Sequence, residues 1–240
     1  MLCGGYDADR CGGSAREQMR GSVILKWLLL VWLAGVILAA FFYVHPAEGF
    51  KGESSRIVFF HVPMAWIAVL AFLISCIASV MYLRRRDPKD DIRASVSAGL
   101  GLLFAVLATV TGSVFAKIMW GAYWNWDPRQ TSITILLLIY AAYLALRGAV
   151  ADPERRAALA AVYAILAFVT VPFLVFVVPR IYWSLHPDTI INTRGTNEFD
   201  SRYTQVLMAS LAGFTGLYIW LYTLGCRIEA IRHRRRQEVL

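Results

Sequence analysis

The sequence predicts an all-α membrane protein, a polytopic bundle of six transmembrane helices with both termini on the cytoplasmic side. Three observations lead to this fold class. Of the 240 residues, 58% are hydrophobic, the apolar residues gather in six blocks, and the basic residues lie mostly in alternate connections. Each block holds about 20 residues or more, which suffices to cross a hydrocarbon core of about 30 Å as a helix. A helix is required because lipid offers the backbone no hydrogen-bond partners.

The predicted spans follow the six apolar blocks. They are 23–44, 57–83, 94–119, 131–150, 157–178 and 203–226. The connections are too short to hold a soluble domain, so we expect one membrane-embedded unit. We divide the chain into a disordered N-terminal extension at 1–18, a six-helix membrane domain at 19–230 and a basic cytoplasmic tail at 231–240.

The orientation is predicted from the basic residues. Of the 24 Lys and Arg residues, 17 lie in the N-terminal tail, the second and fourth connections, and the C-terminus. Cytoplasmic loops carry the excess of Lys and Arg, so the first, third and fifth connections are expected outside. The net charge of +8 therefore indicates contact with anionic membrane lipid and not with nucleic acid.

Missing motifs narrow the function classes. The four cysteines form neither a C-x-x-C pair nor the C-x-x-C-H motif that attaches c-type haem. The sequence also has no P-loop, so a step driven by ATP has to belong to a partner.

The third connection is unusually aromatic, with four large rings within the seven residues 120–126. Trp and Tyr settle at membrane interfaces, but that tendency predicts only one or two rings per helix end. The alternative is an apolar platform for a planar ligand, closed by polar contacts from the residues that follow. Pro128 disfavours helix at the residue before it and marks the start of the fourth span. The candidate ligand-binding residues are Trp120, Gly121, Tyr123, Trp124, Trp126, Asp127 and Arg129.

Three of the four histidines are placed near the outer face. His61 lies about 6 Å inside the second span, and an ionisable side chain at that depth indicates a functional site. A neutral histidine bonded to a neighbouring helix is its structural alternative. His186 follows the fifth span, and His45 follows the first and is assigned to a structural interface. His233 lies in the basic tail, where we expect it to be solvated.

Imidazoles and an aromatic platform on one membrane face suggest a planar metallocycle held through its iron from both sides. Zinc fits less well, because it usually takes three or four closely set ligands.

These residues resemble the CcmC family, the haem-delivery membrane proteins of bacterial cytochrome c maturation. The resemblance covers about residues 20–230 and is strongest in three segments. They are residues 56–66 around the His-Val-Pro motif, the Trp-rich loop at 120–131, and the Trp-Ser-Leu-His motif at 183–186.

The resemblance implies a function and its ligands. Haem b is held at the outer leaflet over the Trp-rich loop, with His61 and His186 as axial ligands. The haem passes to the periplasmic haem chaperone CcmE during c-type cytochrome biogenesis, with the small subunit CcmD and the ABC transporter CcmA/CcmB taking part. The protein is expected in the bacterial inner membrane with its haem site on the periplasmic side.

The loop departs from the family pattern at three positions. The family loop is richer in Trp and reads Trp-Asp-Ala-Arg-Leu-Thr, whereas here Tyr123 replaces a Trp, and Pro128 and Gln130 replace Ala and Leu. Trp-Asp-Pro is closer to the larger relatives CcsA and CcmF, so a CcsA-like cytochrome c synthase subunit is one alternative. A small-solute permease and a purely structural subunit are the others. The sequence shows no nucleophile or general base of an enzyme, although the protein could assist covalent attachment of haem to the chaperone.

Overall fold

The computed structural model describes residues 8–47, 49–186 and 200–238. Its elements are, in chain order, helix α1 at Ala8–Phe42, the 3-10 turn η1 at Gly52–Ile57, α2 at Val58–Arg85, α3 at Pro88–Trp120, α4 at Pro128–Ala149, α5 at Pro153–Pro172, the π-helical turn η2 at Phe173–Val177, α6 at Val178–Ile181 and α7 at Ser201–Glu238.

The prediction of a six-helix membrane bundle is confirmed. Six helical segments of the described chain are long and apolar enough to cross a membrane, namely Val23–Phe42, Gly52–Arg85, Pro88–Trp120, Pro128–Ala149, Pro153–Ile181 and Ser201–Arg235. Across the described ranges the chain is helical with no strand. Each segment coincides with one of the six predicted spans to within a few residues at most ends.

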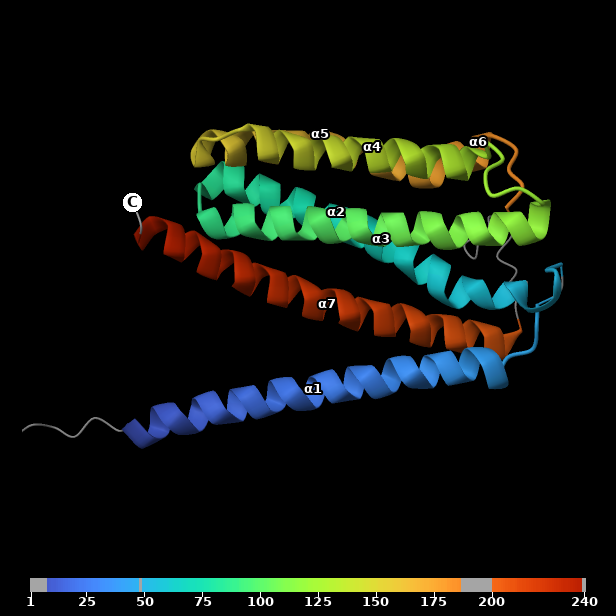
Figure 1. The fold of residues 1–240 in the computed structure, drawn as a ribbon, viewed down its shortest axis with the longest axis horizontal. Helices are drawn as coiled ribbons and strands as arrows, with labels where there is room; N and C mark the ends of the chain where they lie inside the picture. Colours follow the sequence, from blue (N-terminus) through green and yellow to red (C-terminus); the bar gives the residue numbers. More distant parts are fainter. Residues whose placement is uncertain (1–7, 48, 187–199, 239–240) are drawn as a thin grey trace, which may run out of the picture.

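The helices form layers that place the loops at two ends of the bundle (Figure 1). Helices α4 and α5 make one layer, α2 and α3 lie beneath them, and α7 crosses below, with α1 outermost. The start of α1 and the end of α7 lie at the same end of the bundle. The α1–α2 and α3–α4 connections lie at the opposite end, which we call the loop end.

Three of the helices begin with the same dipeptide, Asp-Pro. Asp87, Asp127 and Asp152 are the N-caps of α3, α4 and α5, and each carboxylate accepts a backbone N–H from the first turn. Proline follows at the first helical position, where no N–H is needed and its fixed φ suits the helix. The predicted start of the fourth span at Pro128 is therefore confirmed.

Small residues allow α2 and α3 to pack closely. The Ser97 hydroxyl donates to the carbonyl of Ala71 at 2.6 Å, and a Cβ added at Gly101 would stand 2.5 Å from the ring of Phe72. Ser97 also contacts the hydroxyl of Tyr218 on α7 at 2.7 Å. Such contacts replace the hydrophobic effect, which does not drive helices together within lipid.

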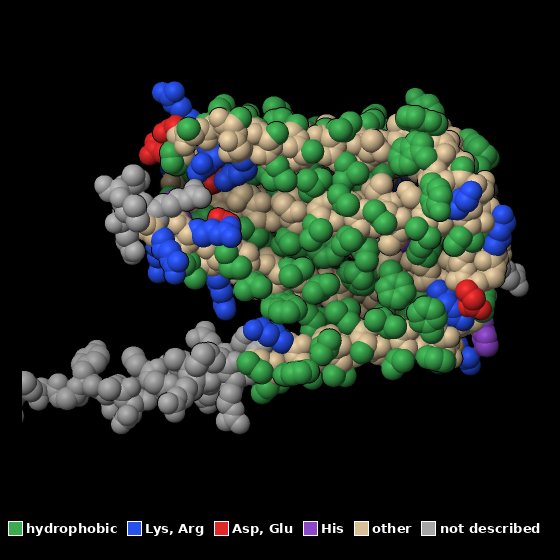
Figure 2. Space-filling model, viewed as in Figure 1, with side chains coloured by type: hydrophobic (Ala, Val, Ile, Leu, Met, Phe, Trp, Pro, Cys, Tyr) green, Lys and Arg blue, Asp and Glu red, His purple; other side chains and the backbone are tan. Residues whose placement is uncertain are grey.

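The surface agrees with a protein embedded in lipid. Figure 2 shows hydrophobic side chains along the length of the bundle, whereas Lys, Arg and acidic side chains gather at its two ends. At the end that holds the termini, Arg147 of α4 forms a two-pronged ion pair with Asp91 of α3, with N–O distances of 2.6 and 2.9 Å. The chain is thus a multi-pass membrane protein.

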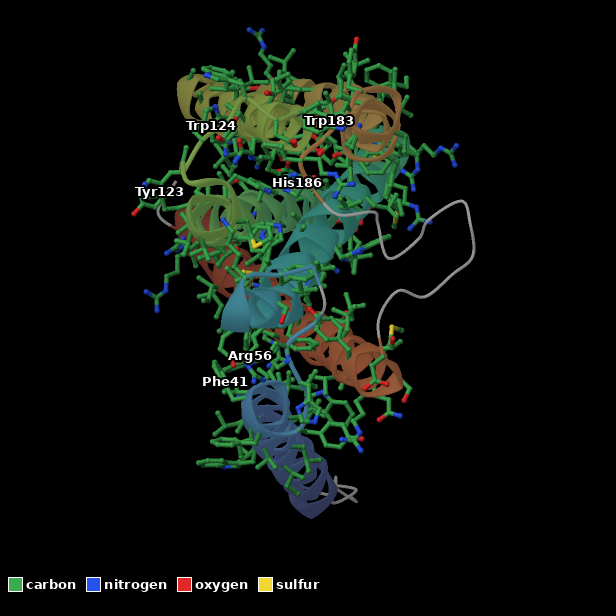
Figure 3. The ribbon with its side chains drawn as sticks, turned by 90° about the vertical axis from the view of Figure 1, so that its right-hand side faces the viewer. Phe41, Arg56, Tyr123, Trp124, Trp183 and His186 are labelled. Carbon is green, nitrogen blue, oxygen red and sulfur yellow. The ribbon has the colours of Figure 1, made fainter. Side chains whose placement is uncertain are left out.

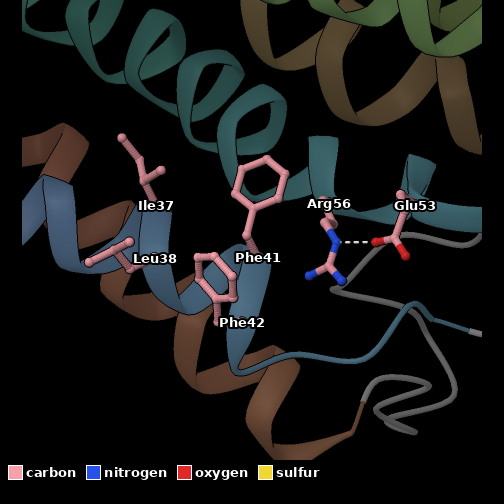
Figure 4. Close-up of a pocket in the computed structure, with 6 residues that line it drawn as sticks. All are labelled: Ile37, Leu38, Phe41, Phe42, Glu53 and Arg56. Carbon is pink, nitrogen blue, oxygen red and sulfur yellow. Dashed lines mark hydrogen bonds and ion pairs between the residues drawn. The ribbon is translucent and has the colours of Figure 1, made fainter.

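Helix α1 is attached mainly through α7. The indole Nε1 of Trp32 donates to the carbonyl of Ala209 at 2.9 Å, and Cβ atoms added at Gly213 or Gly216 would clash with side chains of α1. At the loop end, Arg56 donates to the carbonyl of Ala40 in the last turn of α1 and to that of Val44 just beyond it, and it pairs with Glu53. Figure 4 shows this ion pair beside an apolar pocket. Its lining residues are Ile37, Leu38, Phe41, Phe42, Glu53 and Arg56.

The predicted division of the chain is not marked by breaks in the helices. Helix α1 runs through residue 18, and α7 runs through residue 231. Residues 1–7 and 239–240 lie outside the described part of the chain. The N-terminal extension and the basic tail remain predictions.

Candidate functional site

Chemistry-bearing side chains from distant parts of the sequence meet at the loop end. They come from the second turn of α2, the last turns of α3, the loop at 121–127, the first turn of α4 and the segment 182–186 after α6. Figure 3 looks onto this end, where His186 lies between the Trp-rich loop and the lower part of the bundle that holds Arg56. The predicted site residues in the loop and at His186 are therefore on one end of the molecule.

Asp127 joins the two loops that carry these residues. Its side chain is 1% exposed, and besides capping α4 it accepts the backbone N–H of Leu185 at 2.7 Å. The Ser184 hydroxyl lies 2.9 and 3.1 Å from the two carboxylate oxygens. The Nδ1 atom of His186 lies 3.0 Å from Oδ1. Asp127 thus holds His186 at a fixed place beside the Trp-rich loop.

The charges of this pair follow from burial and hydrogen bonding. Burial lowers the pKa of the His186 imidazole to about 4, and the positive charge of Arg129 adds to the effect, while Asp127 opposes it. For Asp127 burial opposes the shift, but hydrogen bonds from the N–H groups of Arg129 and Leu185 hold its pKa below the usual value. At neutral pH the pair is a carboxylate and a neutral imidazole. Because a carboxylate only accepts, Nδ1 carries the proton, and Nε2 keeps its lone pair.

His61 lies in the second turn of α2 and faces α3. Its Nδ1 is 3.1 Å from the hydroxyl of Thr111, and a Cβ added at Gly112 would stand 2.9 Å from its Cε1 atom. Helix α3, which His61 contacts through Thr111, ends at Trp120, the ring that packs against His186. The two predicted histidines therefore both contact α3, His61 through Thr111 and His186 through Trp120 at its end.

The four aromatic residues of the loop divide into separate groups instead of forming one flat platform. Trp120 packs edge-on against the imidazole of His186, with ring centroids 4.9 Å apart. Trp124 and Trp126 meet at 87° with centroids 5.9 Å apart, and the Nζ of Lys117 lies 5.5 Å from the ring of Tyr123. Perpendicular contacts are what aromatic rings prefer when they pack against each other.

Two rings of the site, Trp126 and Trp183, stand out into the surroundings. Trp126 is 77% exposed and has a φ of 54°, a conformation that is strained for a bulky side chain. Trp183 is 82% exposed and lies at the same end of the bundle as Trp124 (Figure 3). Both rings are displayed at the loop end, where a ligand or a partner could reach them.

Gly121 has a backbone role. It ends α3 in a left-handed conformation with a φ of 85°, and its N–H donates to the carbonyl of Lys117. The space around its Cβ position is open, so a side chain at residue 121 would not clash with any neighbour. Glycine is required instead by the backbone conformation, because L-residues rarely adopt that φ.

Three polar residues were not singled out as site residues from sequence. Ser184 ties the His186 segment to Asp127, and Thr111 contacts His61. Gln130 is buried and accepts the backbone N–H of Asn125 at 2.8 Å, which closes the loop onto α4. A polar residue inside a span is a signal that could have identified Thr111. Ser184 and Gln130 carry no such signal.

His45 is exposed beyond the end of α1. Among the described residues no group of three or more His, Cys, Asp or Glu side chains could hold a metal ion. What the site offers is two imidazoles with a buried carboxylate, a cation and exposed indole rings. This combination suits a planar ligand with a central metal better than a bare ion.

Comparisons with known proteins agree with this interpretation. A family model described as heme exporter protein C matches residues 14–240. The chain is 35% identical over 215 residues to heme exporter protein C of Bradyrhizobium diazoefficiens, covering 87% of this chain and 81% of the relative. It is 32% identical over 218 residues to the protein of that name from Rhodobacter capsulatus, covering 88% of each chain.

A more distant bacterial relative shows the same likeness. Heme exporter protein C of Escherichia coli K12 is 30% identical over 170 residues, which are 70% of this chain and 67% of that protein. The family model spans both histidines of the site and the whole Trp-rich loop. The chain therefore belongs to the CcmC family, heme exporter protein C.

Proposed function

We propose that this protein binds haem at the loop end and delivers it to the haem chaperone CcmE during c-type cytochrome biogenesis. One observation carries the proposal: the buried carboxylate of Asp127 holds the imidazole of His186 against Trp120, at the loop end of the bundle where α2, which carries His61, also begins. The name of the relatives, heme exporter protein C, identifies haem as the cargo.

The two histidines fit haem iron as axial ligands. Each has its Nδ1 in a hydrogen bond, His186 with Asp127 and His61 with Thr111, so Nε2 is the nitrogen available to iron. A ligating histidine almost always has its other nitrogen engaged in this way, because the bond orients the ring. Bound haem b would supply the iron that both imidazoles ligate.

The other residues of the site complement the rest of a porphyrin. Arg129 supplies a positive charge for a haem propionate, through a charge-assisted hydrogen bond. The rings of Trp124, Trp126 and Trp183 offer apolar surface, and each ring contact is worth about 0.5–1.5 kcal/mol beyond burial. Asp127 does not serve the propionates, because like charges repel and its oxygens are already engaged. Its part is to hold His186.

The proposed orientation of the bundle in the membrane supports transfer of haem to a partner on the periplasmic side. We assign the loop end to the periplasmic side of the bacterial inner membrane, because the basic residues favour the opposite end. Haem held there is within reach of CcmE, and CcmD with the ABC transporter CcmA/CcmB completes the proposed system. The haem type, the axial ligands and these partners are inferred from the family and the site.

A spectroscopic experiment tests the proposal. The purified protein should show a Soret band and a low-spin spectrum, and His61→Gly and His186→Gly should each lose haem or become high-spin. Added imidazole should partly restore the low-spin spectrum, since it can replace the missing side chain. His45→Gly is the matched control, because His45 is an exposed histidine of the same end. Haem loss in that control, with a normal spectrum for His186→Gly, would refute the ligand assignment.

The alternative functions have less support. The matched family is heme exporter protein C, and the relatives named above share that name, which favours neither a permease nor a structural subunit. A CcsA-like synthase subunit is likewise not favoured, although Trp-Asp-Pro occurs here. In the structure Pro128 simply begins α4 beside its Asp127 cap.

A further inference from the structure

The hydroxyl of Thr111 on α3 lies within hydrogen-bonding distance of three groups, one of which is the imidazole of His61. It lies 3.1 Å from Nδ1 of the imidazole, 2.9 Å from the carbonyl of Leu107 and 3.1 Å from the carbonyl of Ala108. A hydroxyl has a single proton to donate, but its oxygen has two lone pairs. Only one of the three groups can be the acceptor of that proton at a time.

Geometry and chemistry assign the proton to the helix backbone. Threonine inside a helix ordinarily donates to the carbonyl three or four residues earlier, and both such carbonyls are in range here. With that proton given to the backbone, the Thr111 oxygen has only lone pairs left to offer Nδ1 of His61. The imidazole must then be the donor, so it faces α3 with an N–H group.

We propose that Thr111 is a positioning residue that holds His61 in the tautomer with the proton on Nδ1, so that the Nε2 lone pair is directed to the haem iron. The proposal rests on the proposed function for the identity of the ligand. Gly112 contributes the space, because any side chain there would meet the imidazole.

The arrangement makes the two haem ligands unequal. His186 donates to a carboxylate, whereas His61 donates to a neutral hydroxyl. A negatively charged acceptor raises the basicity of a ligating imidazole more than a neutral one. His61 would therefore be the weaker of the two ligands if both bind haem iron.

The test compares Thr111→Val, which keeps the shape without the hydroxyl, with Thr111→Ser, which keeps the hydroxyl. Thr109→Val is the matched control, because the Thr109 hydroxyl donates to its own helix at the carbonyl of Ala105. Nitrogen-15 NMR of histidine-labelled, haem-free protein gives the tautomer, and a His61→Gln spectrum identifies the signal. Haem dissociation to an excess of apomyoglobin gives the second readout.

We expect a single tautomer with the proton on Nδ1 in the wild type, in Thr111→Ser and in the control. Thr111→Val should add the other tautomer and release haem about 10-fold faster or more, the size found when such hydrogen bonds are removed. The same tautomer and release rate in Thr111→Val as in the control would overturn the proposal. If the proposed haem-binding function is wrong, the result is different, because the wild type would not hold low-spin haem. The NMR spectrum of the haem-free protein would still report the effect of Thr111 on the His61 tautomer.

Discussion

Asp127 serves a helix and a binding site with the same two oxygen atoms. Its Oδ1 accepts the N–H of Arg129 as the cap of α4, and the same atom lies 3.0 Å from Nδ1 of His186. The two roles can be separated by chemistry. Asparagine is as good a cap as aspartate, but its amide cannot accept on both sides.

Asp127→Asn should therefore weaken haem binding, by about 10- to 100-fold, while leaving the helix start intact. Asp127→Ala should lose about 1 kcal/mol of stability as well, because the cap is removed. Haem titration and thermal unfolding measure the two effects. Asp152→Asn is the control, since Asp152 caps α5 in the same way at the other end of the bundle. Equal haem affinity in Asp127→Asn and the control would contradict the role of the carboxylate.

A substitution at Gly112 can show whether haem binding depends on the close packing of His61 against α3. A Cβ at this position would lie 2.9 Å from Cε1 of His61, so Gly112→Ala should displace the ring and lower haem retention by several-fold or more. Gly99→Ala in the same helix is the matched control, because its added methyl group meets open space. The measurement is haem content after purification. A Gly112→Ala protein with the haem content of the control would show that the ring can move without loss.

At the scale of helices, a serine on α7 supplies the hydrogen bond that a proline removes from α2. Pro63 lies inside α2 and has no N–H, which leaves the carbonyl of Phe59 without its usual helical donor. The hydroxyl of Ser210 on α7 donates to that carbonyl. The site where α2 would be weakest is thus tied to α7, within one turn of His61.

Ser210→Ala should destabilise the protein by about 0.5–2 kcal/mol, because it leaves a carbonyl unsatisfied in a buried, apolar place. Thr215→Val on the same helix removes a hydroxyl that donates only to its own backbone, at the carbonyl of Leu211, and should cost less. Denaturant unfolding in detergent measures both. The double variant Pro63→Ala with Ser210→Ala should recover stability, since alanine restores the missing N–H; no recovery would argue against the pairing.

For the whole molecule, the orientation in the membrane is determined by the distribution of basic residues and not by the fold. Cysteines placed at Gly52 and Ala122 should react with an impermeant thiol reagent from the periplasmic side. Cysteines at Lys89 and Pro153 should react only after the membrane is opened. The native Cys3, Cys11, Cys76 and Cys226 would first be replaced with serine or alanine. Labelling of Gly52→Cys from the cytoplasm alone would reverse the assigned orientation.

The fold could be predicted from the sequence almost in full, because a membrane span is recorded locally as a run of apolar residues. The site could be predicted only in part. His61 and the Trp-rich loop stand out by residue type and position, so each was a candidate before any contact was known. Thr111 and Ser184 act through partners about 50 and 57 residues away. Such roles depend on the packing of helices, which local composition does not encode.

The attachment of α1 to α7 has a consequence for how the chain is made. The ribosome synthesises α1 first and α7 last, so the indole of Trp32 has no acceptor at Ala209 until the rest of the protein is in the membrane. During that time α2 to α5 can assemble, since they pack on one another and all of them are made before α7. The first helix to enter the bilayer is therefore the last to find its place, and biosynthesis closes the bundle by bringing its two ends together.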